Sequence, residues 1–233
     1  MLKSAVSGLA FAGRFSLVAF VTATVLLSTA FAEEPPSSLE QLSQLQQEYG
    51  PFDGRQLQPV LEAGLALQEQ GHHRDAIPLL QHAFQLSRVV DGLYNEAQLD
   101  LLDRLVDSEI ALENWQRVDE HYAYMEQLYR HLYDEYDMRL EQGLQKIVAW
   151  HVNALEFDLD DRHEYHLRAT NNLFKSRLRV AKNILDEDHP KFDFLYEGIA
   201  LSASQLRLYS RMNRELLGDS SRRNRDAMIA DID

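Results

Sequence analysis

The stretch that most constrains the fold lies between Gln56 and Arg88. Apolar residues recur there at three- and four-residue intervals on both sides of Gly71, as they do along one face of an α-helix. Gly71 suits the turn between the two segments, because glycine readily adopts the positive φ that ends a helix. In the second segment, the small residues Ala76 and Ala83 lie seven apart and allow another helix to approach closely. The stretch therefore predicts an antiparallel helical hairpin.

The pattern of this hairpin returns along the chain at an offset of 42 residues. Superposing Ala76 on Val118 aligns a second pair of helices, and the same offset predicts a third pair from near Glu141. An internal period of about 20 to 50 residues is typical of stacked structural units. The alternation of apolar and polar residues that predicts β-strands does not occur in the sequence. The chain is therefore expected to be all-α, with helical hairpins stacked over residues 56–217.

This pattern resembles the tetratricopeptide repeat. The resemblance rests on small residues where the helices of that repeat meet, which are Gly64, Gly71, Ala76 and Ala83. The long period, and the acidic-His-Pro segment at residues 186–190, resemble the kinesin-light-chain-like variant. Residues 49–53, together with Asn114 and Trp115, are similar to exported repeat proteins of Gram-negative bacteria. The resemblance implies a short right-handed solenoid of antiparallel helical hairpins that binds protein partners without catalysis.

The first 32 residues have the layout of a secretory signal peptide. Lys3 and Arg14 supply positive charge, an uncharged apolar run follows, and Ala30-Phe31-Ala32 offers small residues to a signal peptidase. This layout predicts export to the periplasm. The alternative is an uncleaved anchor in the inner membrane, because Phe15 to Ala32 contains no charge and approaches the length of a spanning helix.

Two segments flank the predicted repeats. Residues 33–55 begin with proline and serine and are expected to form a flexible lead-in with a short helix. The repeat domain is expected to end at Leu217. Residues 218–233 are polar, and a disordered tail is expected there.

The chain carries a formal net charge of −14 at pH 7. Because so acidic a surface repels phosphate groups, nucleic acid is not an expected partner; a protein or peptide is favoured, and a basic one suits the charge of the chain. The sequence contains no cysteine, which excludes disulfides and thiolate zinc sites. Contact with a membrane is expected only through the N-terminal segment, if that segment stays uncleaved. A homo-oligomer, acting as a structural or assembly subunit, is the main alternative to a scaffold for other proteins.

A candidate partner-binding face follows from the repeat register. The first helix of each hairpin would line a concave surface through the residues Gln58, Leu61, Leu65, Gln68, Asp100, Asp103, Asp107, Gln142 and Gln145. An acidic stripe of this kind suits a basic or polar peptide by charge complementarity. The competing interpretation is the solvated face that every amphipathic helix presents.

A second candidate lies near His163 and His166, which follow the acidic segment 158–161. Their spacing puts both imidazoles on one helix face, where carboxylates could complete a divalent metal site. A polar helix start with an acidic first turn explains the same residues. The sequence has neither a Gly-x-Ser-x-Gly elbow nor a glycine-rich phosphate loop after a strand. No catalytic residue, metal ligand or cofactor is therefore predicted, and a helical enzyme with a site near His166 is kept only as an alternative.

Overall fold

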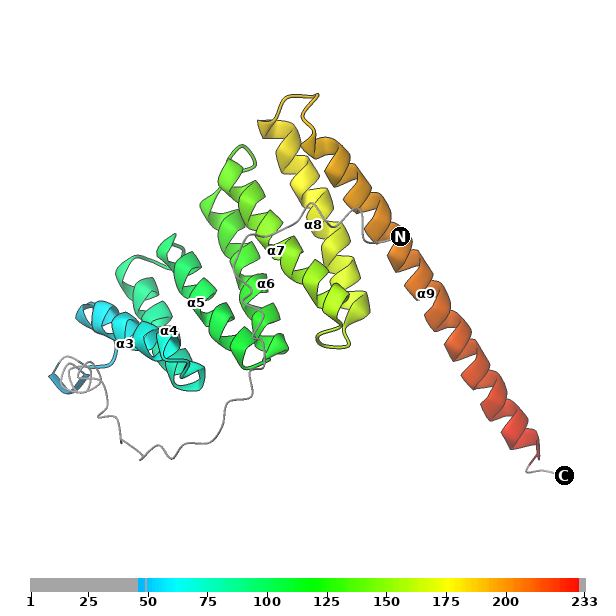
Figure 1. Ribbon diagram of the computed structural model, residues 1–233, viewed down its shortest axis with the longest axis horizontal. Helices are drawn as coiled ribbons and strands as arrows, with labels where there is room; N and C mark the ends of the chain where they lie inside the picture. Colours follow the sequence, from blue (N-terminus) through cyan, green and yellow to red (C-terminus); the bar gives the residue numbers. More distant parts are fainter. Residues whose placement is uncertain (1–45, 49, 231–233) are drawn as a thin grey trace, which may run out of the picture.

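The computed structural model describes residues 46–48 and 50–230, with side chains up to residue 214. All regular structure in this part of the chain is helical, which confirms the predicted all-α class. The predicted signal peptide and most of the lead-in lie outside the described residues. The elements follow one another as η1 Gly54–Gln56, α3 Leu57–Glu69, α4 His73–Val90, α5 Ala97–Ala111, α6 Trp115–Leu132, α7 Met138–Phe157, α8 His163–Ile184 and α9 Lys191–Ala230 (Figure 1).

The helices pack mainly against their neighbours in the sequence, from α3 on α4 through to α8 on α9. They form a row with α3 at one end and α9 at the other (Figure 1). Side chains also join helices two apart: Lys146 of α7 pairs with Asp103 of α5, and Arg162 before α8 pairs with Asp119 of α6. Both pairs span 43 residues, so the contacts between helices recur at nearly the offset seen in the sequence.

The first hairpin consists of α3 and α4 and contains the small residues on which the resemblance rests. Gly71 forms the turn with a φ of +80°. Gly64 lies against Leu80, and a Cβ added at Gly64 would come within 3.1 Å of that side chain. Ala76 and Ala83 have no exposed surface. Gly64, Ala76 and Ala83 therefore lie in the packed interior, and Gly71 forms the turn of the hairpin.

Replacing Gly71 by alanine is expected to destabilise the protein by about 1 kcal/mol, because an alanine Cβ is strained at positive φ. Space is not the cause, since a Cβ at this position would meet nothing within 4 Å. Urea unfolding at neutral pH measures the change. Replacement by asparagine, which tolerates this conformation better, should cost less, and equal losses for the two variants would contradict the conformational explanation.

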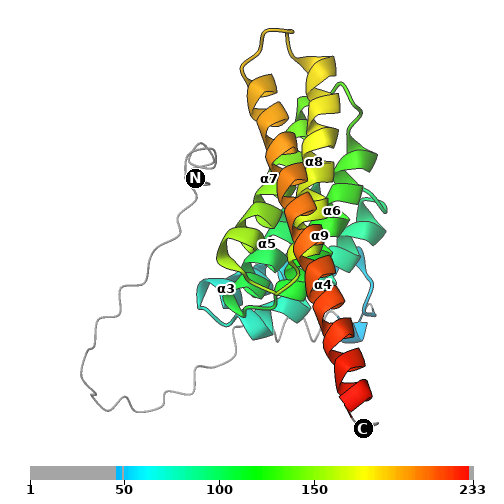
Figure 2. The ribbon, with the colours of Figure 1, turned by 90° about the vertical axis from the view of Figure 1, so that its right-hand side faces the viewer.

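The last helix continues beyond its expected end at Leu217. Helix α9 runs from Lys191 to Ala230, so the segment expected to be a tail is helical up to residue 230. Gly218 costs a helix only about 1 kcal/mol relative to alanine, and no proline follows it. In Figure 2 this helix lies in front of α7 and α8. None of the described helices combines the length and apolar character needed to cross a bilayer.

Two later glycines also mark close contacts between helices. A Cβ added at Gly143 of α7 would lie 2.4 Å from the ring of Tyr129 of α6, and one at Gly198 of α9 would lie 2.6 Å from the ring of Phe174 of α8. Real Cβ atoms do not approach other atoms so closely. Aromatic rings therefore pack directly on the helix backbone at both interfaces.

A buried ionic cluster joins α7, α8 and α9. Oε1 of Glu141 accepts hydrogen bonds from Nε and Nη2 of Arg177 at 2.9 and 2.8 Å. Oε2 of Glu141 accepts another from Nζ of Lys191 at 2.7 Å. The side chain of Glu141 is fully buried and that of Arg177 is 1% exposed. The cluster thus ties the start of α9 to the two helices before it.

Candidate functional site

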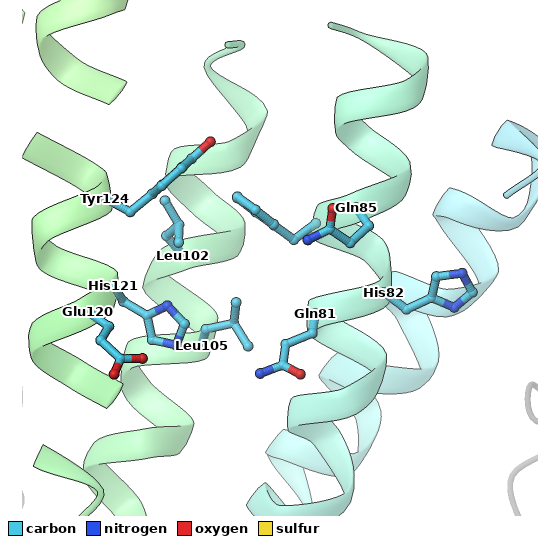
Figure 3. A pocket seen from close by; sticks show the side chains of 9 residues that line it. Gln81, His82, Gln85, Leu102, Leu105, Glu120, His121 and Tyr124 are labelled. Atoms are coloured by element: carbon cyan, nitrogen blue, oxygen red, sulfur yellow. The ribbon is translucent and has the colours of Figure 1, made fainter. Parts of the chain in front are cut away.

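A groove opens between α4 and α6, with α5 behind them (Figure 3). Its volume is about 420 Å³. The floor is apolar and the rim is polar. The lining residues are Gln81, His82, Phe84, Gln85, Leu102, Leu105, Glu120, His121 and Tyr124.

The aromatic edge of the groove is held in place from within the fold. The ring of Tyr124 packs edge-on against Phe84, with 5.5 Å between the ring centroids. The hydroxyl of Tyr124 donates to Oε1 of Gln98 at 3.3 Å. In contrast, the rim residues Gln81 and Gln85 are exposed. The groove therefore has a fixed aromatic edge beside amide groups that face solvent.

A histidine adds an unsatisfied polar atom to this groove. Within the described residues, Nε2 of His121 is buried and has no hydrogen-bond partner. The nearest acidic atom is Oε1 of Glu109, 4.0 Å away, which is beyond hydrogen-bond distance. Burial lowers the pKa of His121, so the ring is neutral at pH 7. The groove is therefore lined by a neutral histidine whose Nε2 lies inside the fold.

The face predicted from the repeat register lies on α3, α5 and α7, and several of its residues are engaged within the chain. Nε2 of Gln68 donates to the carbonyl of Arg104 at 2.7 Å. Asp103 forms an ion pair with Lys146 of α7. Oε1 of Gln145 accepts from Nη2 of Arg177 at 3.2 Å.

The other residues of this face are more accessible. Leu61 and Leu65 are half-buried, whereas the exposed side chains are Gln58, Asp100, Asp107 and Gln142. Partial desolvation of its carboxyl group by neighbouring protein atoms, followed by the like charge of Asp103, raises the pKa of Asp107 although its side chain is exposed. The acidic stripe is therefore partly neutralised by Lys146 and partly open to solvent. Its role in binding stays a prediction.

A buried polar cluster lies between α6, α7 and α8. Nε2 of His166 lies 3.0 Å from both carboxylate oxygens of Asp160. Its other ring nitrogen, Nδ1, lies 2.8 Å from Nδ1 of His151. His166 is 1% exposed and His151 is 5% exposed. The two imidazoles therefore meet inside the protein, next to one carboxylate near the surface.

Asp119 completes this cluster from α6. Its Oδ1 accepts a hydrogen bond from Nε1 of Trp150, and its Oδ2 accepts one from Nη1 of Arg162 at 2.7 Å. The Asp119 side chain is 4% exposed, whereas that of Arg162 is 41% exposed. The arginine therefore covers the cluster on the side of the solvent.

The groups of this cluster differ in the direction in which their surroundings shift their pKa values. Burial, followed by the neighbouring His166, lowers the pKa of His151 to about 3, so that ring is neutral at pH 7. Burial raises the pKa of Asp119 despite its bond to Trp150. Burial also acts to raise the pKa of Asp160, but its hydrogen bonds from His166 and Arg162 lower the pKa overall.

The structure separates the two histidines that the sequence placed on one face. His163 lies 3.3 Å from Asp158 and stacks on Tyr209 of α9. His166 instead points toward α7. Sequence reasoning missed Asp119 and His151 as members of the cluster. Each of these two residues is a polar residue on or beside the apolar face of its own helix, and this position could have identified them in the sequence.

No family model matches this chain, and no curated protein matches it at a significant level.

Proposed function

We propose that this chain is a non-enzymatic protein-interaction scaffold of the bacterial cell envelope. In this proposal it is an exported tetratricopeptide-like array, a short right-handed solenoid that binds a peptide segment of a partner protein. The recurrence of side-chain contacts at 43 residues supports the repeat architecture. The N-terminal sequence supports export.

The groove between α4 and α6 is the observation that carries the proposal. Its volume of about 420 Å³ lies within the range of about 300 to 1,000 Å³ that ligand pockets occupy. Phe84, Leu102 and Leu105 line the floor, and Phe84, at 9% exposed, offers most of the apolar surface among these three residues. The amides of Gln81 and Gln85 offer donors and acceptors to its backbone. An apolar centre with a polar rim is also the usual anatomy of a protein interface.

The groove is favoured over the acidic stripe because it is a hollow with an apolar floor. Asp103 of the stripe has a cationic partner in Lys146. A partner in the groove can gain apolar contact, whereas a cation at the stripe must compete with Lys146 for Asp103.

The test is affinity capture from envelope extract with the full chain as bait. We expect one stoichiometric partner, and we expect the double substitution Gln81→Trp, Gln85→Trp to reduce its capture at least tenfold by filling the groove. Both glutamines are exposed, so neither change should unfold the protein. Circular dichroism checks this.

The matched control is Asp100→Lys with Asp107→Lys, which reverses charge on the stripe but leaves the Asp103–Lys146 pair intact. Capture should be unchanged in this variant. If the control loses the partner and the tryptophan variant keeps it, the binding surface is the acidic stripe. Self-association as the sole interaction would instead favour the assembly-subunit alternative.

A further inference from the structure

The polar cluster of α6, α7 and α8 brings two imidazole rings and two carboxylates together inside the protein. Nε2 of His166 faces the Asp160 carboxylate at 3.0 Å, so this nitrogen carries a hydrogen and donates it. In a neutral His166 ring, Nδ1 is then a lone pair. It faces Nδ1 of His151 at 2.8 Å. This contact is either a hydrogen bond that a neutral His151 donates from Nδ1, or a place where the lone pairs of both rings face one metal ion.

The surroundings match a metal site in the kind and number of ligands. Asp119, His151 and His166 each offer one ligand atom, and these atoms lie within 4.8 Å of one another. Zinc binds imidazole nitrogen and carboxylate oxygen at about 2.0 to 2.2 Å, so two ligands of one tetrahedral ion lie about 3.3 to 3.6 Å apart. Ligand atoms near the outer limit of 4.8 Å would have to approach by up to about 1.5 Å, and the two Nδ1 atoms at 2.8 Å would have to separate by about 0.6 Å.

The groups around these ligands also match those that commonly surround a bound metal ion. A metal-bound imidazole commonly donates its second N–H to a carboxylate, and Asp160 provides this contact for His166. Trp150 and Arg162 hold the two oxygens of Asp119 in the same way. Each ligand except His151 is thus oriented by a second group.

The charges favour a divalent ion as well. The two carboxylates of Asp119 and Asp160 lie beside two imidazoles, while the charge of Arg162 is shared with solvent because its side chain is 41% exposed. One divalent cation balances both carboxylates and leaves both rings neutral. Imidazole and carboxylate ligands together suit zinc and neighbouring transition metals.

We propose that Asp119, His151 and His166 bind one divalent transition-metal ion, best matched by Zn²⁺, with Asp160 orienting His166. The three ligands come from three successive helices, so the ion would join α6, α7 and α8. A bound ion stabilises the folded state, because the unfolded chain does not hold the ligands together. This site is separate from the groove and independent of the proposed scaffold function.

The test uses the full chain, stripped with a chelator and then titrated with Zn²⁺ or Co²⁺. We expect one tightly bound ion per chain by elemental analysis after gel filtration. The unfolding temperature should rise by several degrees with Zn²⁺. Co²⁺ should give the visible absorption of a low-coordinate site with nitrogen and oxygen ligands.

Variants separate this site from binding to surface histidines. His151→Gln and His166→Gln should each lose the stoichiometric ion and the Co²⁺ spectrum. His163→Gln should retain both, since that ring contacts Asp158 and Tyr209 instead. If a variant fails to fold, the Co²⁺ spectrum of the wild-type protein still shows whether a site with nitrogen and oxygen ligands binds the ion.

Two results would overturn the proposal. Wild-type protein that binds no stoichiometric ion, with an unfolding temperature that Zn²⁺ leaves unchanged, would mean that the two rings meet only through a hydrogen bond. Stoichiometric binding that survives both His151→Gln and His166→Gln would place the ion elsewhere.

Discussion

Replacing Glu141 by alanine is expected to destabilise the protein by about 3 to 5 kcal/mol, which is the usual cost of removing one partner of a buried ion pair. Arg177 is 1% exposed and would lose both of its hydrogen bonds to Glu141. Its remaining acceptor is Oε1 of Gln145, at 3.2 Å. The guanidinium charge would then be buried without a counter-ion. Lys191 is 25% exposed and can turn its ammonium group toward water, so the loss of Glu141 costs less free energy at this residue.

Denaturant unfolding at neutral pH measures this loss of stability, and two further variants serve as comparisons. Glu120→Ala removes an exposed pair with Arg117 and should cost under about 1 kcal/mol. The double variant Glu141→Met, Arg177→Met removes both buried charges, and it should be more stable than Glu141→Ala. A loss below about 1 kcal/mol for Glu141→Ala would show that water reaches Arg177.

The second large effect is expected for Gly143→Ala, which should destabilise the protein by about 1 to 3 kcal/mol through overpacking. The new Cβ would lie 2.4 to 2.6 Å from three atoms of the Tyr129 ring. The ring would have to move, although it is half-buried against α7 and packs on Tyr133. This cost exceeds the gain of about 1 kcal/mol that alanine brings to a helix interior.

Gly64→Ala is the matched control, because it makes the same change in another helix. There the nearest atoms belong to the flexible end of Leu80, at 3.1 and 3.2 Å. The loss should be smaller than at Gly143, or absent. Thermal unfolding of both variants provides the comparison. Equal stabilities would mean that Tyr129 repacks freely between α6 and α7.

The sequence contained enough information for the helices and for their spacing. The turn at Gly71 and the buried positions Ala76 and Ala83 could be predicted because backbone conformation and small size are local requirements. The end of α9 could not be predicted in the same way. Gly218 weakens a helix without ending it, and the residues after it contain no stronger break.

The polar cluster could not be predicted as a unit, because its members meet through packing between helices. His151 and His166 are 15 residues apart, and Arg162 lies 43 residues from Asp119. Their contact depends on the rotation of each helix, which the spacing of apolar residues fixes only to within part of a turn. The groove was missed for a related reason: it lies on α4 and α6, whereas the repeat register directed attention to α3, α5 and α7.

Packing mainly between sequence neighbours has a consequence for how the protein responds to stress. In such a row each helix is stabilised by the one before it and the one after it, so cooperativity passes through nearest-neighbour interfaces. Among the described α-helices, α3 and α9 each pack on one neighbouring α-helix. Amide hydrogen exchange should therefore be slowest in α6 and α7, at the centre, and should become faster toward both ends.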